Sequence, residues 1–238
     1  MKNLTKIFVV AFLFLVTKGF AQKTETFFND ADVFFGNCVA NGKVDYEAIH
    51  KNPEKLNVLL KQAENISVSS EDAKIYQAFW INAYNLAVIK GVIDNYGIKS
   101  PMDKSGFFDK TEYKLGGTSL TLNDIENKKL RAKFNEPRFH FVLVCGAKSC
   151  PPLISEVYRP ETLENQLEQQ TKKSLNDPEF IKVTNGKVAV SEIFKWYKED
   201  FVKNGQSEID FLNKFRNDKI SEGSKLGYYN YDWRLNSK

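Results

Sequence analysis

The chain has 238 residues, of which 42% are hydrophobic and 13% aromatic, with 34 basic and 30 acidic side chains. This length and composition suit one domain that buries a sizeable core without a disulfide framework. Residues 1–21 contain Lys2, Lys6 and Lys18 but no acid, so the remainder is close to neutral, with 31 basic and 30 acidic residues. That balance removes most of the case for nucleic acid or an anionic membrane surface as a partner.

The first 21 residues have the layout of a secretory signal peptide. Lys2 and Lys6 precede the apolar run Ile7 to Val16, and Gly19-Phe20-Ala21 supplies small residues at the cleavage positions. The apolar run is about half the length needed to cross a bilayer, so we expect no stable membrane anchor after cleavage. We therefore expect an exported protein, periplasmic or secreted, whose mature chain begins near Gln22.

Motifs of several common enzyme classes are missing. The sequence has no phosphate-cradling glycine-rich loop, no dinucleotide fingerprint and no nucleophile elbow. With only His50 and His140, and no closely spaced Cys–His set, no metal site or cofactor is predicted. Three cysteines allow at most one internal bridge, which leaves an odd thiol that is either buried or reactive.

The first part of the chain is mainly helical. Residues 22–43 form a predicted N-terminal extension with a helix from Phe27 to Val39, which Asn41-Gly42 ends. A second helix is predicted from Pro53 to Glu64. Ser70, followed by acids, indicates the start of a strong third helix that runs to Gly97.

The middle of the chain is richer in strands and turns. Gly116-Gly117 between two apolar stretches, Tyr113–Leu115 and Ser119–Leu122, predicts a hairpin. Asn123 or Asp124 is expected to cap a short helix into Lys133. The apolar run from Phe139 to Cys145 is interpreted as a buried strand that ends in a tight loop.

The last part alternates again between helix and strand. The predicted elements are an amphipathic helix from Pro160 to Leu175, a hairpin of Phe180–Val183 and Lys187–Val190 around Asn185-Gly186, and two helices over Ser191–Val202 and Glu208–Phe215. Together the elements indicate a single-domain α+β protein over residues 44–236, with several helices packed around a small, mainly antiparallel sheet.

Candidate chemistry gathers in the segment from His140 to Pro152. In a regular strand His140 and Cys145 would be ~17 Å apart on opposite faces, whereas a turn at Gly146 allows Cys150 to come back along the strand. Three interpretations of the cysteines stay open: small buried residues, a Cys145–Cys150 disulfide contributing ~2 kcal/mol, or a catalytic thiol. His140 is either a core histidine or the base for such a thiol.

A second candidate site lies on the third helix. Asn82 and Asn85 are three residues apart, so they share one face of an otherwise apolar stretch. Buried amides need partners, which are either a ligand or a neighbouring loop. Trp80, Tyr84 and the loop residue Lys148 complete the set of predicted ligand-binding residues.

The third cluster lies in the last helices and the aromatic tail. Phe194, Tyr197 and Phe201 share a helix face and are interpreted as core. Glu192, Glu199 and Asp200 could supply carboxylates to a site, but acids on an amphipathic helix usually face solvent. The tail from Tyr228 to Asn236 is too aromatic for a loose end, so we expect it to pack on the domain, with an ion pair between Asp232 and Arg234.

Three blocks of sequence carry a family resemblance: Ala78-Phe79-Trp80-Ile81-Asn82-Ala83-Tyr84-Asn85, the segment from His140 through Cys145-Gly146-Ala147-Lys148-Ser149-Cys150-Pro151-Pro152, and Tyr231-Asp232-Trp233-Arg234-Leu235-Asn236. Together they resemble the family known as domain of unknown function 547. The resemblance covers roughly Val44 to Asn236 and implies one domain, commonly exported from bacteria, with no settled activity. The helix followed by a His-bearing segment is also loosely similar to papain-like and transglutaminase-like cores. In those cores a cysteine stands at the start of the helix, whereas the comparable helix here offers Asn82 and Asn85.

These observations favour a binding module for envelope peptides or polymers, with a groove between the Trp80–Asn85 helix and the Cys145–Pro152 loop. One alternative is a thiol-dependent hydrolase or transferase that uses Cys150 or Cys145 with His140. The other is a structural partner of an envelope complex. The ligand or protein partner itself is not identified by the sequence.

Overall fold

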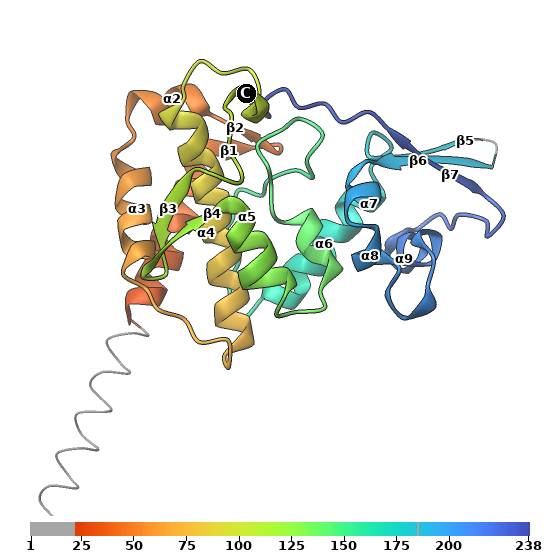
Figure 1. Cartoon of the computed structure of the whole chain (residues 1–238), viewed down its shortest axis with the longest axis horizontal. Coiled ribbons are helices and arrows are strands. Elements are labelled where there is room, and N and C mark those ends of the chain that lie inside the picture. Colours follow the sequence, from red (N-terminus) through yellow and green to blue (C-terminus); the bar gives the residue numbers. More distant parts are fainter. Residues whose placement is uncertain (1–21, 185) are drawn as a thin grey trace, which may run out of the picture.

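A computed structural model describes residues 22–184 and 186–238 (Figure 1). The predicted signal peptide and Asn185 of the second hairpin lie outside these residues. The first half contains a helix over residues 22–38, β1 (Val39–Ala40), β2 (Lys43–Val44), α2 (Tyr46–Lys51), α3 (Glu54–Glu64), α4 (Ala73–Asp94), the 3₁₀-helix η1 (Pro101–Asp103), β3 (Glu112–Leu115) and β4 (Thr118–Thr121).

The second half begins with a short helical run and ends in a tail. Its elements are α5 (Leu122–Asp124), the π-helix η2 (Ile125–Arg131), the 3₁₀-helix η3 (Pro137–Phe141), α6 (Leu163–Leu175), β5 (Ile181–Thr184), β6 (Lys187–Ser191), α7 (Ile193–Trp196), α8 (Lys198–Phe201), the 3₁₀-helix η4 (Lys203–Gly205), α9 (Glu208–Phe215) and β7 (Lys225–Tyr229). The α+β prediction is confirmed, as are the helices predicted at α3 and α9 and both hairpins.

Helix α4 is the centre of the larger, N-terminal part of the molecule. It is apolar on all its faces and buried over most of its length, as expected for a helix surrounded by other elements. Helices α2, α3 and η2 pack against it. The Asp72 side chain caps its first turn by accepting a hydrogen bond from the Ile75 N–H, so the cap lies two residues after the predicted Ser70.

The strands of the described residues form three small sheets. β1 with β2 and β3 with β4 are antiparallel pairs, and β5, β6 and β7 form a third sheet in which β7 runs parallel to β6. Strand β7 begins the aromatic tail, which then crosses the molecule to the N-terminal part (Figure 1). There the Val44 N–H donates to the Asn236 carbonyl, so the tail packs on the domain as predicted.

Two hydrophobic clusters form the core. The larger surrounds α4, and the smaller is mainly aromatic, with Phe141, Phe194, Phe201 and Phe211 in mutual contact. Helix η3 connects them, because Phe139 belongs to the first cluster and Phe141 to the second. Helix η3 therefore lies at the junction of the two clusters.

The strand predicted from Phe139 to Cys145 is wrong. An apolar run of this length does not distinguish a buried strand from a buried helical segment. Pro137 in the first turn and the Glu136 side chain, which accepts from the Arg138 N–H, favour the 3₁₀-helix η3. After η3, the chain hydrogen-bonds to Asn85 instead of a neighbouring strand, with Val142 O accepting from the amide and Val144 N–H donating to it, each at 2.9 Å.

The cap predicted at Asn123 or Asp124 is also displaced. Thr121 accepts from the Asp124 N–H, and the Asp124 carboxylate accepts from the Thr121 N–H, which forms a reciprocal capping box. The helix then continues as the π-helix η2. Each π-helical turn holds an extra residue, so the side chains of η2 point in directions that an α-helical wheel does not predict.

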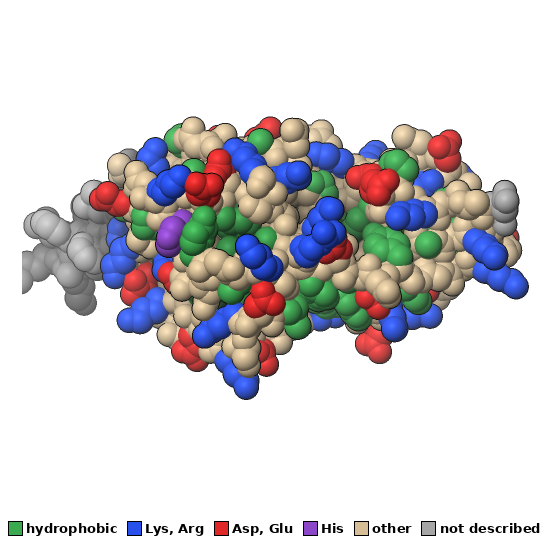
Figure 2. Space-filling model, turned by 90° about the horizontal axis from the view of Figure 1, so that it is seen from above, with side chains coloured by type: hydrophobic (Ala, Val, Ile, Leu, Met, Phe, Trp, Pro, Cys, Tyr) green, Lys and Arg blue, Asp and Glu red, His purple; other side chains and the backbone are tan. Residues whose placement is uncertain are grey.

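Basic and acidic side chains alternate over the surface shown in Figure 2, with apolar side chains between them. This is the ordinary pattern of a solvated surface. Among the described residues, no helix combines the length and the apolar character that a membrane span requires.

We expect Asn85→Ala to lower the free energy of unfolding by about 3 kcal/mol, because it leaves a buried carbonyl and a buried N–H without partners. Urea unfolding followed by far-UV circular dichroism measures the change. Asn57→Ala, at an exposed position of α3, is the matched control and should stay within about 0.5 kcal/mol of the parent protein. Equal stability of the two variants would contradict the role given to Asn85.

Candidate functional site

A cavity of about 370 Å³ lies where the two hydrophobic clusters meet. Helix α4 contributes Tyr84, η2 contributes Glu126 and η3 contributes His140. The remaining walls come from the loop before β3, α5, the segment from residue 143 to residue 151, α7 with the residue after it, and the tail: Phe108, Asn123, Leu143, Cys145, Cys150, Pro151, Ile193, Trp196, Tyr197, Tyr231 and Trp233. Its volume suits a small ligand or one residue of a larger one.

Cys145 and Cys150 form a disulfide in the wall of this cavity. Both residues are half-buried. The Tyr231 hydroxyl lies 3.2 Å from Cys145 Sγ and 3.1 Å from Cys150 Sγ, and the Cys145 N–H donates to Cys150 Sγ at 3.1 Å. Because a disulfide sulfur carries no hydrogen, Tyr231 is the donor in its contacts.

The disulfide loop, residues 145–150, is also held by the tail. The backbone N–H groups of Lys148 and Ser149 donate to the carbonyls of Arg234 and Asp232, and the Asn236 N–H donates to the Gly146 carbonyl. The Gly146 backbone has a φ of +80°, which favours glycine, and a Cβ there would lie 3.2 Å from Val88. The loop therefore has a defined shape that does not depend on the disulfide alone.

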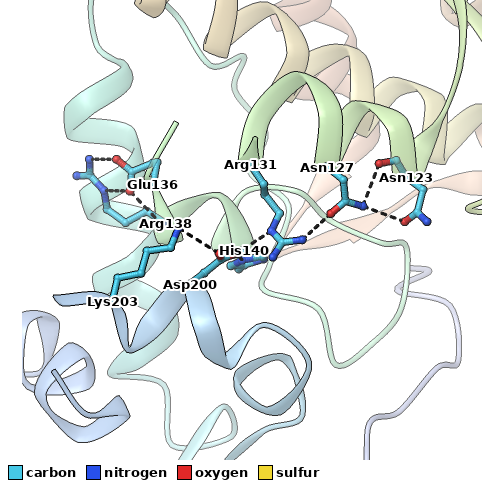
Figure 3. Close-up of polar contacts among 8 residues, drawn as sticks. All are labelled: Asn123, Asn127, Arg131, Glu136, Arg138, His140, Asp200 and Lys203. Atoms are coloured by element: carbon cyan, nitrogen blue, oxygen red, sulfur yellow. Dashed lines mark hydrogen bonds and ion pairs between the residues drawn. The ribbon is translucent and has the colours of Figure 1, made fainter. Parts of the chain in front are cut away.

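His140 is held by a charged network at one end of the cavity (Figure 3). Its Nε2 is 2.8 Å from Asp200 Oδ2, which also accepts from Arg131 Nε at 2.7 Å. The His140 ring stacks on Tyr197 with centroids 4.0 Å apart. Burial alone would raise the pKa of Asp200, but the hydrogen bonds from His140 and Arg131 outweigh it and hold that pKa well below its usual range.

Glu126 places a carboxylate in the same cavity. Its side chain is largely buried, with 8% exposed, and no cation of the described residues lies within ion-pair distance of it. Burial, and then the Glu126 charge, raise the pKa of both Tyr84 and Tyr197. The two phenols are consequently neutral at physiological pH, and the Tyr197 hydroxyl hydrogen-bonds to the Glu126 side chain.

Aromatic rings from α7 and the tail form another part of the cavity wall. Trp196 and Trp233 stack with centroids 5.7 Å apart, and Tyr231 contacts both, at 5.0 and 4.8 Å. Phe108 extends the cluster, 6.2 Å from Trp233. Trp196 is 44% exposed, so the wall is open to solvent at its rim.

The structure brings only part of the predicted site together. Tyr84, His140, Cys145 and Cys150 line the cavity. The predicted separation of His140 and Cys145 on opposite strand faces does not occur, because the segment between them is not a strand.

The other predicted binding residues lie elsewhere. Asn82 donates to Tyr158 O and accepts from Tyr158 N–H, so like Asn85 it ties α4 to a loop. Trp80 packs over Gly116, where a Cβ would come within 2.7 Å of the ring. Lys148 is exposed, and its backbone N–H is bonded to the tail.

Two acids of the site were not predicted in their roles. Asp200 was named only as an acid that could supply a carboxylate and would usually face solvent, because its partner His140 is 60 residues away. Glu126 lies in a charged stretch with Lys128 and Lys129, which is typical of a surface helix. The aromatic tail was predicted to pack on the domain, and its residues Tyr231 and Trp233 also line the cavity.

Cys38 is the free thiol among the described residues, and burial raises its pKa to about 12, which makes it unreactive. The predicted ion pair of Asp232 with Arg234 is confirmed, at 2.5 Å. In residues 22–184 and 186–238, no three His, Cys, Asp or Glu side chains lie close enough together to hold a metal ion.

Comparison with known proteins gives one match. Residues 68–175 match the model of the family described as "Protein of unknown function, DUF547". This segment belongs to the family, and it includes α4, Glu126, His140 and the disulfide loop. No curated protein and no solved structure matched the chain.

We expect Asp200→Asn to lower the free energy of unfolding by about 2 kcal/mol at pH 7, because His140 and Arg131 lose a charged acceptor. The folded pKa of Asp200 lies below its unfolded value of about 3.9, so the stabilisation is present at neutral pH and declines as the pH falls below that value. The difference between variant and parent should therefore shrink between pH 5 and pH 2.

Urea unfolding at a series of pH values measures this effect. Glu199→Gln, an exposed position in the same helix, is the control and should change stability little at any pH. A pH-independent effect of Asp200→Asn would show that the carboxylate charge is not what stabilises the network.

Proposed function

We propose that this protein is a ligand-binding module whose cavity takes an organic cation, a protonated amine or guanidinium on an apolar body. The observation that carries the proposal is the Glu126 carboxylate, which lies buried in the cavity without a paired cation from the described residues. A buried carboxylate is costly unless it is paired, and a ligand cation would supply the pair.

The aromatic wall supports the same ligand chemistry. Tryptophan and tyrosine rings attract cations through their negative faces, and Trp196, Tyr231 and Trp233 present such rings to the cavity. The rings also bury the apolar part of a ligand. Arg131 interacts electrostatically with Glu126, but its guanidinium is bonded to Asp200 and lies over the Tyr197 ring, 4.8 Å from the centroid.

The ligand source that fits is the amine-bearing peptides or polymers of a cell envelope. The signal-peptide pattern of residues 1–21 supports an exported protein, and the disulfide supports an oxidising compartment. A cavity of about 370 Å³ has room for one side chain or one amino sugar, so we propose that it recognises one unit of a longer molecule.

Benzylamine should bind saturably and change the tryptophan fluorescence, since Trp196 and Trp233 line the cavity. Benzyl alcohol, which has a similar shape and no charge, should bind at least tenfold more weakly. Glu126→Gln should weaken benzylamine binding about tenfold or more and leave benzyl alcohol unchanged, because a charged contact contributes ~1.5–3 kcal/mol.

Glu112→Gln, exposed on β3, is the matched control and should bind benzylamine like the parent protein. Isothermal titration calorimetry provides the affinities. Equal binding of the amine and the alcohol, or equal binding by the Glu126→Gln variant, would refute the proposal. Saturation by neither probe would favour a structural partner of an envelope complex instead.

A further inference from the structure

We propose that the Cys145–Cys150 disulfide is a thiol-exchange centre, in which a peptide or small-molecule thiol that enters the cavity attacks Cys145 and Cys150 is the leaving sulfur. This goes beyond ligand binding and does not depend on Glu126.

The two sulfurs have different surroundings. Cys150 Sγ accepts hydrogen bonds from the Cys145 N–H and the Tyr231 hydroxyl, both at 3.1 Å, whereas Cys145 Sγ contacts only the hydroxyl, at 3.2 Å. If the bond breaks, both donors can stabilise a thiolate on Cys150. Hydrogen bonds to the charged form lower a thiol's pKa, and a leaving thiol of lower pKa departs faster.

Tyr231 is suited to this role. Burial, and then neighbouring tyrosines and Glu126, hold its pKa well above the usual value, so the hydroxyl keeps its proton at physiological pH. The ring is fixed between Trp196 and Trp233, which keeps the hydroxyl beside both sulfurs.

The loop is both accessible and supported without the bridge. Both cysteines line the cavity and are half-buried, so a small thiol can reach them. Backbone hydrogen bonds from the loop to the tail residues Asp232, Arg234 and Asn236 remain when the disulfide is open. If the disulfide served only to hold the loop in shape, it would duplicate the restraint that those hydrogen bonds already provide.

The proposed exchange has two steps. A thiolate RS⁻ attacks Cys145 Sγ, an R–S–S–Cys145 bond forms, and the electron pair of the broken bond goes to Cys150 Sγ as a thiolate. A second thiolate, R′S⁻, attacks the R sulfur of this mixed disulfide, which gives R–S–S–R′ and a Cys145 thiolate. The two cysteines take up the two protons that the attacking thiols lost. When R and R′ belong to one molecule, this sequence oxidises that dithiol. The reverse sequence reduces an external disulfide and restores the bond between Cys145 and Cys150.

The test uses the full chain and β-mercaptoethanol. Timed reaction, acid quenching, alkylation and mass spectrometry give the rate of reduction and the site of the first adduct. We expect the adduct on Cys145 in the native protein. Tyr231→Phe should slow the reaction about three- to tenfold, because one thiolate donor is lost. Tyr229→Phe, whose hydroxyl bonds to the Phe180 carbonyl, is the matched control and should react at the parent rate.

The adduct position in the parent protein tests the proposal even if Tyr231→Phe does not fold. An adduct on Cys150, reduction only under denaturing conditions, or an unchanged rate in folded Tyr231→Phe would each overturn it. Comparison with cysteamine separates this proposal from the binding function. If Glu126 attracts cations, Glu126→Gln should lower the ratio of the cysteamine rate to the β-mercaptoethanol rate, because a ratio taken on one protein cancels any general effect of the substitution on exchange. An unchanged ratio would count against the binding function alone, since the adduct on Cys145 does not require Glu126.

Discussion

The cavity depends on one buried side-chain amide, that of Asn85 in the middle of α4. Its oxygen accepts from the Val144 N–H and its nitrogen donates to the Val142 carbonyl, so it satisfies two backbone groups on one short segment. Those groups would otherwise need a neighbouring strand. Because the amide replaces the strand, the chain leaves η3 in an irregular path that brings Cys145 to the same cavity as His140 of η3.

The tail supports the disulfide loop and supplies part of the cavity wall. It crosses from β7 to β2, bonds to the disulfide loop on the way, and adds Tyr231 and Trp233 to the cavity wall. One side of the loop is therefore fixed through Asn85 and the other through the tail, whose residues are far apart in sequence. The walls of the cavity therefore depend on contacts with elements of both hydrophobic clusters.

Patterns that are local in the sequence were predictable, and those set by distant partners were not. Hydrophobic spacing and turn residues gave α3, α9 and both hairpins, since these depend on neighbours within a few residues. The segment from Phe139 to Cys145 was misassigned because its backbone partner is an amide from another helix. Glu126 was missed because a π-helix turned a residue of a surface-like stretch inward, and the role of Asp200 because its partner is His140.

The charges of the cavity connect its two proposed properties. The wall carries the Glu126 carboxylate, while the phenols of Tyr84, Tyr197 and Tyr231 stay protonated because burial raises their pKa values. A thiolate on Cys150 would add a second negative charge to a space that already holds one, which the carboxylate opposes and the Tyr231 hydroxyl and Cys145 N–H favour. A bound cation would neutralise Glu126 and so remove the opposition. By linkage, opening of the disulfide would then strengthen cation binding by the same factor by which the cation favours opening.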